Sequence, residues 1–161
     1  MEHEPRSLGE TVQWLRTIRA SLDSDQHYRY GIFDAARDLV GEVMLIGRGG
    51  DGALELGYWL HVDQVGQGYA AEASAALTRV AFELRGVDRV EIQCEPENVR
   101  SGVLASRLGY NLEATLRRRA NRGDMEPKDL QVWTLFRSEY EVASPGQDTV
   151  VAYDCLGEQI L

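Results

Sequence analysis

The sequence predicts an α+β domain with a mixed, mostly antiparallel sheet flanked by helices. Three short apolar segments between residues 28 and 62 are joined by polar or glycine-rich turns, which is typical of an antiparallel meander. An alanine-rich helix over residues 69–84 then separates two strands, and such a strand–helix–strand unit makes its strands parallel. Because 161 residues suffice for one domain with a real core, we expect a single domain over 1–161.

The N-terminal half is predicted as one helix followed by three strands. Ser7 and Glu10 form a capping box, which marks the start of a helix. Apolar residues then recur at helical spacing, namely Val12, Leu15, Ile18 and Leu22. Apolar runs bounded by turn residues predict strands over 28–33, 39–46 and 54–62.

The C-terminal half is predicted as a strand, a short helix and a strand pair. A strand over 89–94 follows the alanine-rich helix. Asn98 is a suitable N-cap for a short helix that ends at Gly109. Strands are then expected over 112–116 and 130–136, around a polar loop at 117–129, and the tail over 143–161 is expected to add a last strand at 149–153.

Composition excludes several classes of protein. The net charge of −9 argues against a nucleic-acid binder, which needs a basic face. No apolar run approaches the roughly 20 residues of a membrane span, and the acidic N-terminus has no secretory signal pattern. Two cysteines, Cys94 and Cys155, form neither a disulfide framework nor a metal-ligand cluster. We therefore expect a cytoplasmic protein without a metal.

The glycine-rich turn over residues 65–68, between an apolar strand and the alanine-rich helix, is the most informative feature. Glycines let a ligand approach the backbone, and a helix N-terminus offers unpaired N–H groups to an anion. This combination indicates a phosphorylated cofactor. Two other interpretations are a tight turn without a ligand and a dinucleotide site, because Gly66, Gly68 and Ala71 fit that fingerprint and Glu91 follows about twenty residues later. The single strand–helix–strand unit disfavours the dinucleotide site.

Two motifs around this turn resemble those of one enzyme family. The first is Gly57-Tyr58-Trp59-Leu60 followed by Val65-Gly66-Gln67-Gly68-Tyr69-Ala70-Ala71-Glu72-Ala73. The second is Cys94-Glu95-Pro96-Glu97-Asn98-Val99-Arg100-Ser101, with Leu108-Gly109-Tyr110 and Glu113-Ala114 after it. Together they resemble the GNAT N-acetyltransferases, and in particular the branch that acetylates N-terminal residues of ribosomal proteins. The resemblance covers a core over about 39–136.

The resemblance implies a GNAT-like sheet with a V-shaped opening between two central parallel strands, and acetyl-CoA as co-substrate. The turn would hold the CoA pyrophosphate, and the strand end and Asn98 would hold the pantetheine arm. The implied cofactor-binding residues are Leu60, His61, Val62, Val65, Gly66, Gln67, Gly68, Tyr69, Ala70, Ala71 and Asn98. At Val65 most members carry Arg, Gln or Trp, so one contact to the cofactor is in doubt.

The same resemblance implies catalytic roles. Ser101 matches the residue that the ribosomal branch places beside the leaving thiolate. Many GNAT enzymes use a tyrosine seven residues after the asparagine, but Ala105 occupies that position here, which leaves Ser101 or a water as the acid. Glu55 and Glu42 are candidate bases that would take a proton from the amine through water.

The implied function is transfer of an acetyl group from acetyl-CoA directly to a primary amine, either a protein or peptide N-terminus or a small amine. The alternative is a CoA-binding or regulatory module that has lost its chemistry. The family also begins with a strand and a helix that we do not find upstream of Ser7. The resulting open sheet edge makes a homodimer or an exchanged strand plausible.

Overall fold

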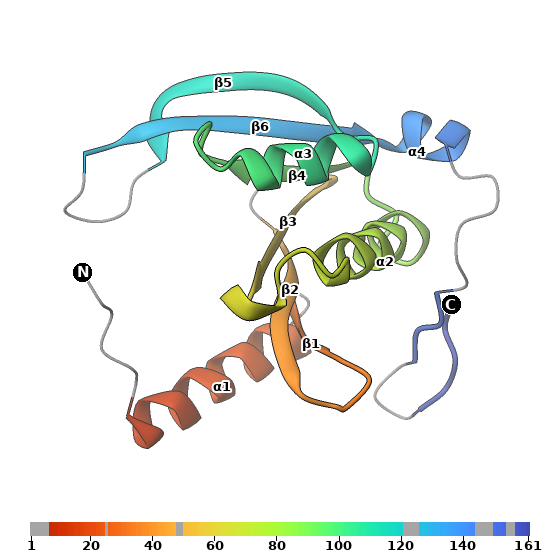
Figure 1. The fold of residues 1–161 in the computed structure, drawn as a ribbon. Coiled ribbons are helices and arrows are strands. Elements are labelled where there is room, and N and C mark those ends of the chain that lie inside the picture. The colour runs from red at the N-terminus through yellow and green to blue at the C-terminus, as the bar shows by residue number, and fades with distance from the viewer. Residues whose placement is uncertain (1–6, 25, 48–49, 121–125, 144–149, 154–156) are drawn as a thin grey trace.

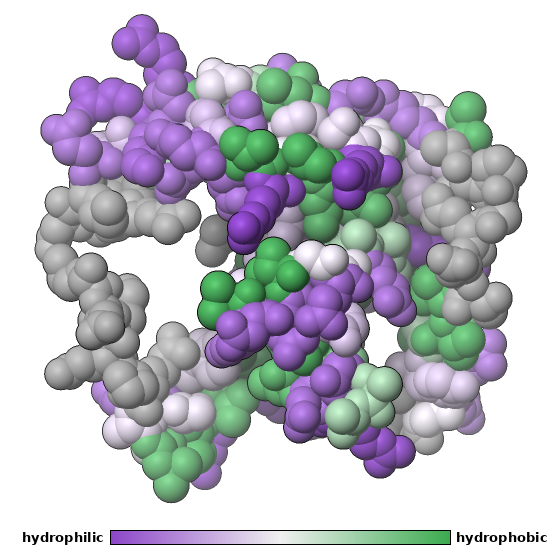
Figure 2. Space-filling view, in the orientation of Figure 1, coloured by the Kyte–Doolittle hydropathy of each residue, from purple (hydrophilic) through white to green (hydrophobic). Residues whose placement is uncertain are grey.

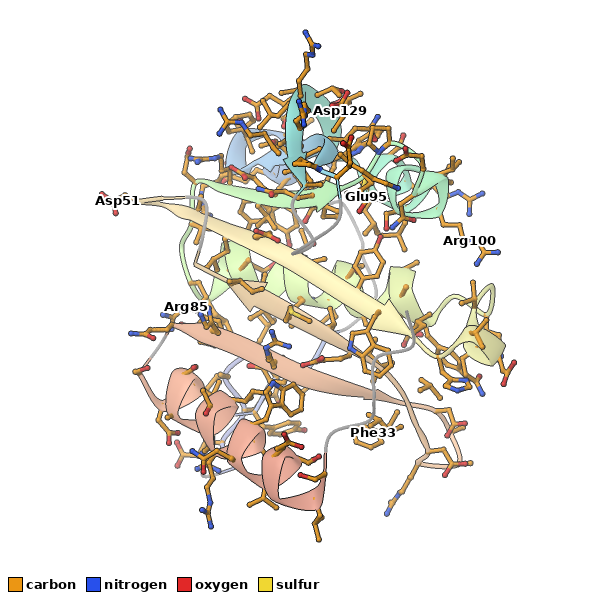
Figure 3. All side chains as sticks on the ribbon, turned by 90° about the vertical axis from the view of Figure 1, so that its left-hand side faces the viewer. Phe33, Asp51, Arg85, Glu95, Arg100 and Asp129 are labelled. Carbon is orange, nitrogen blue, oxygen red and sulfur yellow. The ribbon has the colours of Figure 1, made fainter. Side chains whose placement is uncertain are left out.

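The computed structural model of the protein describes residues 7–24, 26–47, 50–120, 126–143, 150–153 and 157–161. Six strands form one sheet, with α1 on one face of its N-terminal half and α2 on the other (Figure 1, Figure 3). The elements are α1 (Leu8–Asp23), β1 (His27–Phe33), β2 (Leu39–Ile46), β3 (Ala53–Leu60), the 3₁₀ turn η1 (Val62–Gln64), α2 (Tyr69–Glu83), β4 (Arg89–Cys94), α3 (Val99–Arg107), β5 (Asn111–Ala120), β6 (Lys128–Phe136) and α4 (Arg137–Ala143). The predicted fold class is confirmed.

The sheet has the order β1-β2-β3-β4-β6-β5, and every neighbouring pair is antiparallel except β3 and β4. The parallel register runs only from Ala53 opposite Arg89 to Glu55 opposite Glu91. Since β3 continues to Leu60 and β4 to Cys94, the two strands separate toward their C-terminal ends. This separation is the V-shaped opening that the family resemblance implies.

The helix α1 begins at the predicted capping box and lies at the edge of the sheet. Ser7 Oγ accepts a hydrogen bond from the Glu10 N–H, and Glu10 Oε2 accepts one from the Ser7 N–H, which completes the capping box. None of its residues is buried, and Val12 and Leu15 are 39% and 53% exposed. The reason is that α1 packs mainly against β1, at the sheet edge, so only its C-terminal end reaches the core, where Leu22 packs.

The hydrophobic core lies between the sheet and α2. Phe82 of α2 and the paired strand residues Leu45 and Leu56 are at most 1% exposed. The Tyr110 hydroxyl, just before β5, lies 2.7 Å from Thr78 Oγ1 of α2. This bond joins α2 to the segment that precedes β5.

The β5–β6 hairpin is longer than predicted. Six of the thirteen residues of the predicted loop over 117–129 belong to strands, because β5 continues to Ala120 and β6 begins at Lys128. No residue of β5 is buried, and its pairing is interrupted by bulges between Leu112 and Ala114 and between Leu116 and Ala120. An exposed, bulged edge strand need not alternate apolar and polar residues, so its sequence resembles that of a loop.

The C-terminal part also differs from the prediction. The helix α4 was not predicted, because tertiary contacts hold it: the Arg137 Nη2 donates to the Phe82 carbonyl at 2.7 Å, and the Tyr140 ring stacks on Phe82 at 4.6 Å. The described residues of the tail add no strand to the six-stranded sheet, and residue 149 of the predicted strand lies outside them. Tyr153 forms an isolated bridge with Gln159. β1 is an edge strand, and strand exchange between two copies stays a prediction.

Candidate functional site

The glycine-rich turn leads from β3 through η1 into α2. Gly66 and Gly68 have φ angles of 89° and 93°, a conformation that other residues adopt at a cost. A Cβ at either position would meet no atom within 4 Å, so backbone conformation and not space requires glycine. Gly68 is the N-cap of α2 and no side chain caps this helix, so the N–H groups of its first turn are available to a ligand.

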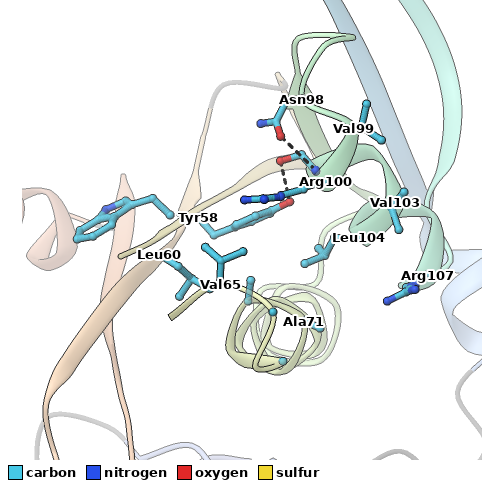
Figure 4. Close-up of a pocket in the computed structure, with 15 residues that line it drawn as sticks. Tyr58, Leu60, Val65, Ala71, Asn98, Val99, Arg100, Val103, Leu104 and Arg107 are labelled. Atoms are coloured by element: carbon cyan, nitrogen blue, oxygen red, sulfur yellow. Dashed lines mark hydrogen bonds between the residues drawn. The ribbon is translucent and has the colours of Figure 1, made fainter. Parts of the chain in front are cut away.

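A cavity of about 670 Å³ lies between this turn, β3 and α3. The space-filling view shows the surface hollowed between α3 and the start of α2, with hydrophobic side chains on both sides (Figure 2). Figure 4 shows the lining residues, which converge from β3, the turn and α3. They are Tyr58, Trp59, Leu60, Val65, Gly66, Gly68, Ala70, Ala71, Asn98, Val99, Arg100, Ser101, Val103, Leu104 and Arg107.

Seven of the eleven predicted cofactor-binding residues line this cavity, namely Leu60, Val65, Gly66, Gly68, Ala70, Ala71 and Asn98. Four do not. The His61 N–H is engaged, because it donates to the Val40 carbonyl at 2.9 Å, and Val62 is 75% exposed. The Gln67 side chain donates to Gln64 Oε1 at 2.9 Å, and Tyr69 packs against the core.

The N-terminus of α3 and β3 meet across the opening at Ser101. Asn98 is the N-cap of α3, and its Oδ1 accepts from the Ser101 N–H at 3.3 Å. From the opposite wall, the Tyr58 hydroxyl donates to Ser101 Oγ at 3.0 Å (dashed in Figure 4). Burial raises the pKa of Tyr58 above its ordinary value of 10.0, and the bond to Ser101 partly offsets this. The sequence gives no sign of this contact, because Tyr58 and Ser101 lie 43 positions apart in the chain.

Glu42 and Glu55, the candidate bases, do not line the cavity. Alternation along β3 places Glu55 on the face opposite Leu56 and Tyr58. Glu42 lies across from Trp59 in the register, and both its carboxylate oxygens are engaged. Oε2 accepts from Trp59 Nε1 at 2.8 Å, and Oε1 accepts from Arg29 Nη1 at 3.0 Å.

The charged residues that line the cavity are both arginines. Arg100 and Arg107 extend from α3, and no aspartate or glutamate is among the described lining residues. They flank Val103 and Leu104 at helical spacing i, i+3, i+4, i+7, a pattern by which the sequence could have revealed them. Two cations, unpaired helix N–H groups and apolar walls suit a long ligand that carries phosphates.

The family model described as Acetyltransferase (GNAT) domain matches residues 1–111, which is more than half of the chain. The chain belongs to the GNAT acetyltransferase family. A solved structure from Vibrio cholerae, provisionally named a ribosomal-protein-serine acetyltransferase, is 34% identical with a TM-score of 0.69, and the match covers 81% of this chain and 75% of that one. The resemblance that the two motifs indicated is therefore confirmed.

Other GNAT relatives match over part of their length. "Probable N-acetyltransferase YjcK" of Bacillus subtilis (strain 168) is 32% identical over 100 residues, which cover 60% of this chain and 55% of that protein. This chain thus spans about half the length of that relative. The spermidine/spermine N-acetyltransferase SpeG from Vibrio cholerae shares the fold, with a TM-score of 0.72 over 83% of this chain and 80% of that one, at 18% identity.

Two further observations concern this GNAT chain's chemistry. Ala105, which replaces the tyrosine that many members carry, is 0% exposed and belongs to the core cluster. Within the described residues, no group of three or more His, Cys, Asp or Glu side chains is placed to hold a metal ion. No helix in that part of the chain is long and apolar enough to cross a membrane.

Proposed function

We propose that this GNAT protein transfers an acetyl group from acetyl-CoA directly to an amine. The proposal rests on one observation. A single cavity extends from the N-terminus of α2, which no side chain caps, to the Ser101 hydroxyl. When bound, acetyl-CoA would supply an acetyl group activated as a thioester. Holding amine and thioester together supplies an effective concentration of up to about 10⁵–10⁸ M, which is much of the rate enhancement such a reaction needs.

The residues that would hold the co-substrate follow from their positions. The N–H groups of Ala70 and Ala71, with Arg100 and Arg107 nearby on the cavity wall, suit the phosphates. Apolar side chains from both walls, such as Leu60 and Leu104, suit the pantetheine chain. Asn98 can present its amide there while its Oδ1 caps α3. The donors and the apolar walls thus suit the chemistry of acetyl-CoA.

We further propose that the acceptor is an α-amino group, as at a protein or peptide N-terminus. The amine must be neutral to attack, and no carboxylate base lines the cavity among the described residues. An α-amino group has a pKa of about 7.7–8.0 and is partly neutral near pH 7.5, whereas a lysine-type amine has a pKa of about 10.4. The 34% identical Vibrio cholerae neighbour, by its name, acts on a protein serine, which supports this choice.

The test measures release of CoA from acetyl-CoA in the presence of a peptide with a free N-terminal serine, the same peptide with a blocked N-terminus, and spermidine. We expect release with the free peptide alone, with a rate that rises with pH until the α-amine is neutral. Acceleration by spermidine but not by the free peptide would contradict the choice of acceptor. No binding of acetyl-CoA by calorimetry would contradict the whole proposal.

A second candidate function is a CoA-binding module without catalysis. The observation that favours it is Ala105, which lies in the core and provides no acid at the position where many members carry tyrosine. Binding of acetyl-CoA without release of CoA for any amine would support this candidate. Transfer to the free peptide would rule it out.

A further inference from the structure

Tyr58 and Ser101 face one another across the opening between the central strands. Tyr58 comes from β3 and Ser101 from the first turn of α3, and both line the cavity. The Tyr58 hydroxyl is the donor and Ser101 Oγ the acceptor, at 3.0 Å. The Ser101 hydroxyl proton has no acceptor among the described residues, so it is available to a ligand in the cavity.

A serine hydroxyl alone is a poor acid for a leaving thiolate. An aliphatic hydroxyl is about as weak an acid as water, with a pKa far above the thiol value of about 8.5. Proton transfer from an isolated serine to a thiolate is therefore strongly unfavourable. A tyrosine hydroxyl has a pKa of about 10 and lies much closer to the thiol.

We propose that Tyr58 supplies, through Ser101, the proton that the leaving thiolate needs. This inference rests on the proposed acetyl transfer. As the amine nitrogen bonds to the carbonyl carbon and the C–S bond breaks, the bonding pair goes to sulfur. Ser101 gives its hydroxyl proton to that sulfur while Tyr58 gives its own proton to Ser101 Oγ. The proton that the amine loses passes to water, and water returns a proton to Tyr58.

The surroundings of Tyr58 determine how readily it gives up its proton. Burial raises the pKa of its hydroxyl, so Tyr58 carries its proton at neutral pH, and the hydrogen bond to Ser101 partly offsets this rise. Two ionisable groups lie near it: the buried Cys94 thiol of β4, whose pKa is raised by burial, and Arg100 of α3, which lines the same cavity. Neither replaces Tyr58 as the donor to Ser101, because the bond at 3.0 Å joins these two hydroxyls directly.

The kinetic test compares Tyr58→Phe, Ser101→Ala and the double variant with the wild type. Since general acid catalysis contributes typically about 10²–10⁴-fold, we expect Tyr58→Phe to lower kcat by about 10²-fold, with KM for acetyl-CoA changed less than about threefold. The double variant should be no slower than Ser101→Ala. The control is Tyr30→Phe on β1, which removes a hydroxyl outside the cavity and should leave kcat unchanged.

Acetyl-seleno-CoA separates proton donation from a merely structural bond. Its selenol leaving group is far more acidic and needs no proton, so the defect of Tyr58→Phe should largely disappear. An equal defect with both substrates, or a Tyr58→Phe rate within about threefold of wild type with acetyl-CoA, would overturn the relay and leave acetyl transfer intact. A wild-type protein that does not bind acetyl-CoA would overturn the proposed function and the relay with it.

A measurement without substrate tests the bond itself. The bond to Ser101 lowers the pKa of Tyr58, so Ser101→Ala should raise it. NMR titration of protein labelled at the tyrosine Cζ, with Tyr58→Phe to assign the signal, would measure this. An unchanged Tyr58 pKa in Ser101→Ala would contradict the hydroxyl pair on which the relay depends.

Discussion

The indole Nε1 of Trp59 donates a hydrogen bond of 2.8 Å to Glu42 Oε2, while Arg29 Nη1 donates to the other oxygen of the same carboxylate. This arrangement ties β1, β2 and β3 together on the sheet face opposite α2. Each oxygen of the Glu42 carboxylate therefore already accepts a hydrogen bond that holds the sheet together. Its predicted role as a base is not favoured by this geometry.

We expect Glu42→Gln to destabilise the protein by about 1–3 kcal/mol, because a charge-assisted hydrogen bond to Arg29 is lost. The rate of acetyl transfer should change less than about threefold, well below the loss for a general base. Denaturant unfolding and CoA release would measure the two effects.

The control for this prediction is Glu91→Gln. The Arg89–Glu91 pair has side chains 27% and 12% exposed, against 28% and 13% for Arg29–Glu42, so a similar loss of stability is expected. A rate loss of about 10²-fold in Glu42→Gln alone would restore Glu42 as the base.

Gly68 offers a test of the cofactor turn. Gly68→Ala should destabilise the protein by about 1–2 kcal/mol, because the φ angle of 93° is costly for alanine, although no atom is within 4 Å of the new Cβ. Any relaxation of the turn moves the N–H groups at the start of α2, so the Kd for CoA should rise about tenfold, or about 1.4 kcal/mol.

Gly109→Ala is the matched control, since Gly109 has a φ angle of 87°, equal space around it and no place in the cavity lining. It should lose similar stability and bind CoA as the wild type does. If both variants bind CoA normally, the turn does not hold the phosphates. Calorimetric titration with CoA gives this comparison directly.

Residue patterns in the sequence predicted the cofactor turn well, but they did not predict the contact between Tyr58 and Ser101. Glycines at 66 and 68 and the capping residues at 7 and 98 act through neighbours in the chain, so their roles follow from spacing. The hydroxyl pair of Tyr58 and Ser101 joins residues 43 positions apart. Strand alternation placed Tyr58 beside Leu56 and Leu60, but only the separation of β3 from β4 brings Ser101 within reach.

The differences between the sequence pattern and the structure have the same physical origin. Val12 and Leu15 have the spacing of a buried face, but whether a face is buried depends on where its helix packs. The helix α4 forms because Arg137 and Tyr140 meet Phe82, which is more than 50 residues earlier in the chain. The extension of β5 was not predicted because an exposed edge strand needs no apolar face, so its sequence shows no alternation of apolar and polar residues.

Asn98 caps the N-terminus of α3 and is also proposed to contact CoA. Two substitutions distinguish these two roles. Asn98→Asp keeps an oxygen that can accept from the Ser101 N–H, so stability should hold, while CoA affinity should fall because the amide donor is lost. Asn98→Ala should lose both affinity and about 1 kcal/mol of stability. Thermal unfolding and CoA titration measure the pair, and unchanged CoA affinity in Asn98→Asp would limit Asn98 to capping.

We expect Tyr110 to influence stability at alkaline pH. Its hydroxyl is buried at 2.7 Å from Thr78 Oγ1, and Thr78 itself donates to the Ser74 carbonyl, so Tyr110 donates to Thr78. Burial raises the pKa of Tyr110 well above the value of about 10 in the unfolded chain. A folded-state pKa above the unfolded one contributes stability that is complete below pH about 10 and is lost as the pH rises toward the folded-state pKa.

We therefore expect Tyr110→Phe to lower the free energy of unfolding by about 1 kcal/mol at pH 7, through loss of one buried hydrogen bond. As the pH rises above about 10, the wild type should lose stability faster than the variant, so that the difference between them shrinks and then reverses. Urea unfolding across this pH range would measure it, with Tyr153→Phe as the control because Tyr153 is 62% exposed and makes no core contact. Parallel stability curves for wild type and Tyr110→Phe would show that the Tyr110 proton plays no part in alkaline unfolding.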